Sequence, residues 1–139
     1  MNLRGVRKVT PRRLVDVARA AALLGQARLR TRQGSQAWVG AIADRQPPSP
    51  QPSAAQRRAI DRTAWAVAVA ARFVPWRSDC LVQALAARAW LAAQGIDSRL
   101  VIGVPGQKGA RFEAHAWLLS HGITVTGGDV TRYRAFHTA

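Results

Sequence analysis

Cys80 is the residue of this chain with the clearest potential for chemistry. It is the only cysteine among 139 residues, and it follows Ser78 and Asp79, two residue types that commonly cap the start of a helix. Backbone N–H groups and the helix dipole at a helix start stabilise negative charge, so a thiol there forms the nucleophilic thiolate more readily. A lone cysteine is also often a small buried apolar residue, which leaves a structural role open.

A histidine that could act as a general base follows on a predicted strand. His115 stands between two alanines, and these small neighbours leave room beside the imidazole for an approaching group. A histidine on a strand can equally be a structural residue. The other two histidines, His121 in a predicted turn and His137 near the end of the chain, are expected to face solvent.

The imidazole of a thiol enzyme is normally oriented by a third group, and two acids are close enough in sequence. Asp129 follows the strand expected to pair with that of His115, whereas Glu113 shares the strand of His115, two residues away. A carboxylate at that distance along one strand would approach Nδ1 sideways. We therefore expect Asp129 to be the orienting acid. A cysteine, a histidine and an acid on elements in this order are the arrangement of papain-like thiol enzymes.

Three helices are predicted before these strands. Thr10 and Pro11 predict a helix over about residues 11–30, with the Thr10 hydroxyl as its cap. Ser53 and Gln56 have the spacing of a capping box and predict a helix over about residues 54–73. Ser78 and Asp79 open the third, over about residues 79–94, which carries Cys80. Residues 31–46 are ambiguous, and the prolines of residues 46–52 predict a loop.

After Gly95 the apolar pattern changes to the two-residue period of strands. Strands are predicted over residues 99–104, 112–120 and 123–126, with a turn over 105–111 and a hairpin at His121-Gly122. Helices followed by an antiparallel β-meander indicate an α+β fold. We expect one compact unit, with a basic helical region over residues 1–52 and the catalytic core over residues 53–139.

The composition limits the classes of function. The net charge is +14, with 12 basic and 2 acidic side chains in residues 1–58 and 9 basic and 5 acidic in residues 59–139. Such an excess favours an anionic partner. The sequence shows neither a membrane-spanning run nor a signal peptide, so we expect a cytoplasmic protein. One cysteine rules out an internal disulfide and a four-cysteine zinc site, and we expect no metal and no cofactor.

Several segments together resemble a known family. Cys80-Leu81 at a helix start, residues 100–104 (LVIGV), residues 114–118 (AHAWL) and residues 125–129 (VTGGD) are similar to the transglutaminase-like cysteine peptidases of lasso-peptide biosynthesis. The resemblance covers about residues 72–136. Residues 1–71 carry no motif that matches.

The resemblance implies a transglutaminase-like thiol hydrolase that removes the leader from a ribosomally made lasso-peptide precursor. It implies Cys80 as nucleophile, His115 as base and Asp129 as orienting acid, although Gly127-Gly128 stand where other members can have this aspartate. Candidate oxyanion donors are the Cys80 backbone N–H, the Gln83 amide and the Trp76 indole. The form without a fused leader-binding domain is expected, working with a separate leader-binding protein and an ATP-dependent cyclase.

Other functions remain open at this point. The charge suits nucleic acid, but the five tryptophans lie mostly in apolar stretches and are not interleaved with the arginines as in a stacking platform. Nucleic-acid binding is therefore disfavoured. The same fold could carry amide transfer or deamidation, because amines as well as water resolve cysteine acyl-enzymes. The chain could also be a scaffold without catalysis.

Overall fold

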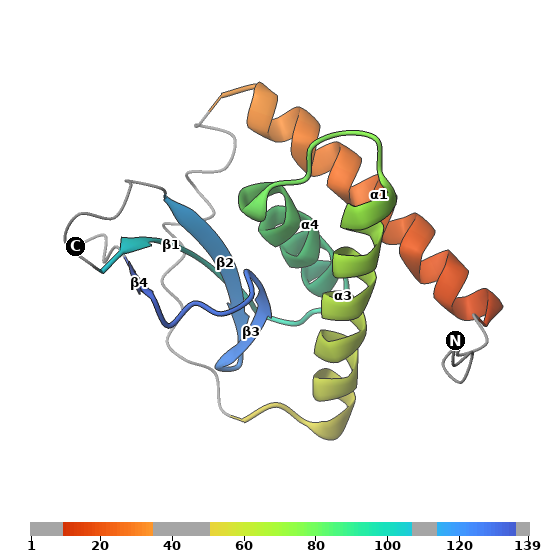
Figure 1. The fold of residues 1–139 in the computed structure, drawn as a ribbon. Coiled ribbons are helices and arrows are strands. Elements are labelled where there is room, and N and C mark those ends of the chain that lie inside the picture. Colours follow the sequence, from red (N-terminus) through yellow and green to blue (C-terminus); the bar gives the residue numbers. More distant parts are fainter. Residues whose placement is uncertain (1–9, 35–50, 107–113, 136–139) are drawn as a thin grey trace, which may run out of the picture.

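The described part of the chain is a layer of helices packed against a sheet. The computed structural model describes residues 10–34, 51–106 and 114–135. Three helices in these segments lie on one side of a four-stranded antiparallel sheet (Figure 1), namely α1 (Pro11–Arg32), α3 (Ala54–Phe73) and α4 (Cys80–Ala93). This order of helices and then antiparallel strands confirms the α+β fold.

The sheet has the order β3-β2-β1-β4. Its strands are β1 (Arg99–Pro105), β2 (His115–Ser120), β3 (Ile123–Thr126) and β4 (Tyr133–Ala135). The first three are the predicted strands, and β3 pairs with β2 as expected. The short edge strand β4 was not predicted. Residues 31–46, which were ambiguous in the sequence, and the loop predicted over residues 46–52 lie largely outside the described residues, and Glu113 and His137 lie wholly outside them.

Local signals explain where the helices begin. Ser53 and Gln56 form both hydrogen bonds of the capping box, at 3.1 and 2.9 Å. The Asp79 carboxylate accepts a hydrogen bond from the Val82 backbone N–H at 3.1 Å, which satisfies one free donor of the first turn of α4. Thr10 differs, because its side chain makes no capping hydrogen bond. The proline that follows it is the signal that places the start of α1.

α4 is the central element of the fold. It contacts α1 and α3 on one side and β1, β2 and β3 on the other. Because neighbours surround it, apolar residues are buried around most of its circumference, including Val82, Ala86, Trp90 and Leu91. The first residue of a helix held in this way has a fixed place relative to the sheet.

None of the helices in the described segments is long and apolar enough to cross a bilayer.

Two turns connect the strands around the site. His121 and Gly122 have φ angles of 49° and 77°, as a two-residue hairpin with two positive φ angles requires, so the predicted hairpin is confirmed. The next turn, from Gly127 to Arg132, leads from β3 across to β4 at the other edge of the sheet.

One ion pair ties α1 to α3. Asp16 is buried, with 7% of its side chain exposed, and Arg62 is 41% exposed. Arg62 donates from Nε to Asp16 Oδ2 at 2.7 Å and also donates from Nη2 to Oδ1. This two-bond contact raises the pKa of Arg62 above its usual value. Within the described segments, Arg62 is the residue that forms an ion pair with this buried carboxylate.

We expect Arg62→Ala to lower the free energy of unfolding by about 1–3 kcal/mol, because it leaves the Asp16 carboxylate buried without its partner. Urea unfolding followed by circular dichroism measures the change. Arg57→Ala is the control, since Arg57 and Asp61 form a pair whose side chains are 59% and 63% exposed. Such pairs contribute about 0–1 kcal/mol. Equal losses in the two variants would contradict a special role for Asp16–Arg62.

Candidate active site

The thiol of Cys80 lies where α4 meets β2. Cys80 is the first residue of α4 and is partly buried. The backbone N–H of Ala116 on β2 donates to its Sγ at 3.4 Å. A donor at the sulfur and the positive end of a helix dipole both favour a negative charge on it. The position of the sole cysteine is therefore suited to a thiolate.

An open cavity of about 540 Å³ adjoins this thiol. One wall is formed around the start of α4, by Arg77, Asp79, Cys80 and Leu81. The other is formed by the strands, through Ala114, His115 and Tyr133. The structure thus brings Cys80 and His115, which are distant in sequence, to the same cavity.

The His115 imidazole is held by backbone and by an aromatic ring. Its Nε2 lies 2.7 Å from the carbonyl oxygen of Gly127, in the turn that follows β3. The Tyr133 ring of β4 stacks on it, with ring centroids 4.6 Å apart and planes inclined by 25°. The hydrogen-bonded nitrogen is therefore Nε2, whereas a bond at Nδ1 was expected from the sequence. The ring is fixed by neighbours on both sides of the strand that carries it.

Asp129 is placed differently from the expectation. It is exposed, and its Oδ1 accepts hydrogen bonds from the Thr131 hydroxyl at 2.7 Å and the Thr131 backbone N–H at 3.0 Å. These two bonds, the hydroxyl one first, lower the pKa of Asp129 below its usual value. Among the contacts of the described residues, its carboxylate makes no hydrogen bond with His115. A catalytic role for Asp129 stays a prediction.

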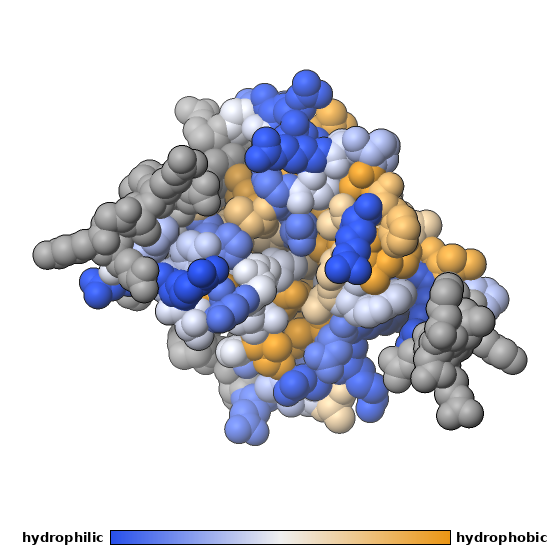
Figure 2. Space-filling model, viewed as in Figure 1, coloured by the Kyte–Doolittle hydropathy of each residue, from blue (hydrophilic) through white to orange (hydrophobic). Residues whose placement is uncertain are grey.

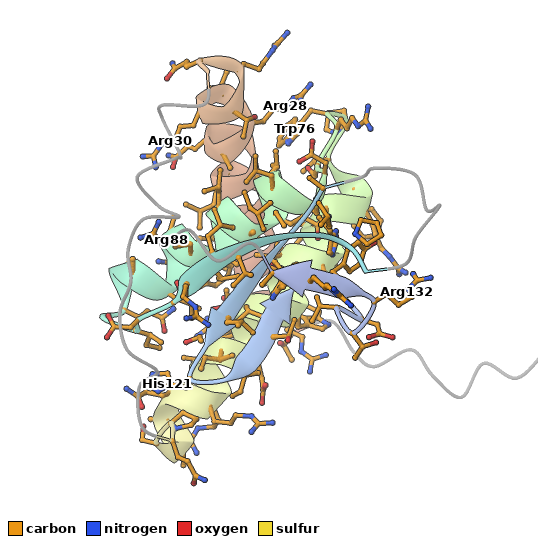
Figure 3. All side chains as sticks on the ribbon, turned by 90° about the vertical axis from the view of Figure 1, so that its left-hand side faces the viewer. Arg28, Arg30, Trp76, Arg88, His121 and Arg132 are labelled. Atoms are coloured by element: carbon orange, nitrogen blue, oxygen red, sulfur yellow. The ribbon has the colours of Figure 1, made fainter. Side chains whose placement is uncertain are left out.

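The three candidate oxyanion donors also differ in their placement. The backbone N–H of Cys80 belongs to the first turn of α4, where helical N–H groups have no acceptor within the helix. The Gln83 amide donates to the Ser78 carbonyl at 2.9 Å. The Trp76 indole, labelled in Figure 3, packs against Gly25 of α1, and its buried N–H has no partner in the described part of the chain. Neither Gln83 nor Trp76 lines the cavity.

Sequence reasoning missed several parts of this site. Tyr133 is the only tyrosine of the chain, but the apolar alternation around it is too short to predict a strand. Arg77, four residues after the end of α3, gives the cavity a cationic group. The Ala116 N–H and the Gly127 carbonyl are backbone groups, which no residue type signals. The Gly127-Gly128 pair that follows β3 was the one available clue to the Gly127 carbonyl, because adjacent glycines are typical of turns.

The described side chains offer chemistry of the nucleophilic kind. No group of three or more histidine, cysteine or acidic side chains within the described segments is placed to hold a metal ion. What they do offer is a thiol with a donor at its sulfur, an oriented imidazole and an open cavity. This combination fits attack on a carbonyl carbon, with the imidazole transferring protons.

Comparison with protein families agrees with this chemistry. The family model described as Transglutaminase-like superfamily matches residues 13–139. The chain belongs to the transglutaminase-like superfamily. Its members are often cysteine hydrolases or transferases, and the matched region begins within α1, further toward the N-terminus than the motifs noted in the sequence. No curated protein and no solved structure matches the chain significantly.

We expect iodoacetamide at pH 6.5 to alkylate native Cys80 faster than it alkylates glutathione, because the helix start and the Ala116 N–H favour the reactive thiolate. Intact-mass spectrometry measures the rate without ambiguity, since the chain has a single cysteine. Cys80→Ala controls for reaction at other groups. Alkylation that occurs only after unfolding in urea would identify a structural thiol instead.

Proposed function

We propose that this member of the transglutaminase-like superfamily is a cysteine peptidase that removes the leader from a lasso-peptide precursor. The observation that carries the proposal is the meeting of Cys80, at the start of α4, with His115 in one open cavity. The similarity of residues 100–104, 114–118 and 125–129 to lasso-peptide leader peptidases supports the choice of substrate.

The first step is acylation. The Cys80 thiolate attacks the carbonyl carbon of the last leader residue and forms a C–S bond. The oxyanion that develops takes a hydrogen bond from the Cys80 backbone N–H, and one such donor can contribute about 3 kcal/mol. His115 gives its proton to the leaving nitrogen. The C–N bond breaks, and the core peptide leaves with a free N-terminus.

The second step is hydrolysis of the leader thioester. His115, now neutral, takes a proton from water as the water oxygen attacks the thioester carbon. The C–S bond breaks, the leader leaves as a carboxylic acid, and the thiolate is restored. An amine in place of water would give amide transfer, so the mass of the leader product distinguishes a peptidase from a transferase.

Cys80→Ala and Cys80→Ser should both lower the rate of leader removal by at least about 10³-fold, because neither side chain supplies a thiolate. The assay incubates the chain with a precursor peptide encoded by a neighbouring gene and follows both products by mass spectrometry. Circular dichroism controls for folding. Cleavage by Cys80→Ala at the rate of the unmodified chain would contradict the mechanism.

The partner proposed for this peptidase is a separate leader-binding protein that docks on the outer face of α1. Leu14, Val15 and Leu29 are 60–66% exposed on α1. Arg12 and Arg30 are also exposed and, being 18 residues apart, lie on one side of the helix. Figure 2 shows apolar and charged residues next to one another on this side of the molecule. A partner with an apolar patch bordered by acids would match this face.

The paired substitution Arg12→Glu and Arg30→Glu should weaken binding of a leader-binding protein encoded nearby by about 10-fold or more, because it reverses two charges at the interface. Isothermal titration calorimetry measures the affinity, and the paired substitution Arg58→Glu and Arg72→Glu at two exposed positions of α3 is the control for net charge. Equal affinities would place the interface elsewhere. Binding of anionic vesicles or random DNA in preference to the protein would replace this partner by another.

A further inference from the structure

We propose that the backbone carbonyl of Gly127 orients the catalytic imidazole in this chain, the task that a side-chain acid performs in the arrangement expected from the sequence. The inference rests on the proposed function, since it gives His115 its place as base. Gly127 is a positioning residue: its oxygen lies 2.7 Å from His115 Nε2 and acts on the substrate only through the imidazole.

A carbonyl oxygen fixes the position of the proton on the ring. It accepts hydrogen bonds and cannot donate one, so Nε2 must carry the N–H in this contact. The neutral imidazole then has its lone pair on Nδ1, which becomes the basic nitrogen. The same contact persists when the ring is protonated, because both nitrogens then carry hydrogens. One acceptor thus serves both protonation states that catalysis passes through.

Glycine at position 127 is what allows the carbonyl to come so close. Its φ angle is 108°, which side-chain-bearing residues rarely adopt. A Cβ at this position would lie 2.4 Å from Cβ of Trp117 and 3.4 Å from His115 Nε2. The turn is therefore pressed onto β2 at a point where only backbone fits, and any larger residue must move the carbonyl.

Asp129 has a different task in this arrangement. Its carboxylate accepts both hydrogen bonds from Thr131 and closes the turn two residues after Gly127. An asparagine would keep the side-chain oxygen and lose only the charge. The Gly127 carbonyl is a neutral acceptor, so its contact with the imidazole places no further negative charge against the ring.

The test reads the proton position directly, by ¹⁵N NMR of the full chain labelled in histidine. His115→Gln identifies the His115 signals among those of the three histidines. At a pH where the ring is neutral, we expect the proton on Nε2 in the unmodified chain. A proton on Nδ1 would overturn the proposal. This readout needs no substrate, so it stands apart from any failure to cleave a precursor.

Three variants complete the experiment. Gly127→Ala should mix the two proton positions and lower kcat about 10- to 100-fold with little change in KM, less than the ~10⁴ lost in a serine protease with the wrong tautomer. Gly128→Ala is the matched control, because Gly128 also has a positive φ, 67°, but its Cβ would meet nothing within 4 Å. Asp129→Asn should keep the proton on Nε2, because the Gly127 carbonyl and not the carboxylate is the acceptor at that nitrogen.

If Gly127→Ala does not fold, the unmodified chain and Asp129→Asn still decide the question. Loss of the Nε2 proton in Asp129→Asn, or a fall in kcat as large as that expected for Gly127→Ala, would assign the orienting role to the aspartate. A mixed proton position in Gly128→Ala, with intact folding, would show that the turn acts only through its general stability, which also overturns the proposal.

Discussion

The burial of α4 is the constraint on which the rest of this structure depends. α1 and α3 cover one side of the helix and the sheet covers the other, so it can neither slide nor rotate without exposing apolar surface. Trp90 and Leu91, which are 1% and 0% exposed, anchor its C-terminal half. Its N-terminus is thereby held against β2, where the Ala116 N–H meets the Cys80 sulfur. The active-site geometry therefore follows from the packing of the core around α4.

Much of the fold could be predicted from the sequence because its signals are local. The Ser53–Gln56 capping box, the Asp79 cap and the His121-Gly122 hairpin each act within a few residues, and each is found in the structure. β4 could not be predicted in the same way. It has only three residues, and it pairs with a strand distant in sequence. This pairing depends on Gly103 of β1, because a Cβ at that position would lie 2.6 Å from the Arg134 carbonyl oxygen.

The residues of the site likewise differ in whether the sequence could reveal them. Cys80 and His115 could be identified because a thiol and an imidazole are reactive groups that the residue type alone reveals. The fold brings both to one cavity. The acceptor at His115 could not be identified, because a carbonyl is present in every residue and only the φ angle of Gly127 selects this one. Asp129 was the natural candidate by residue type. Aspartate, however, also bonds the backbone two residues on, and here Thr131 takes that bond.

The two halves of the site rest on elements that the rest of the structure holds very differently. Cys80 begins a helix enclosed by the core, whereas Tyr133, which stacks on His115, begins an edge strand paired over only three residues. Native-state openings are easiest where few buried contacts hold an element. Fraying of β4 would therefore release one face of the imidazole while α4 and the core stay folded. Amide exchange would show this as protected N–H groups in α4 beside rapidly exchanging ones in β4, within a few ångströms of the same cavity.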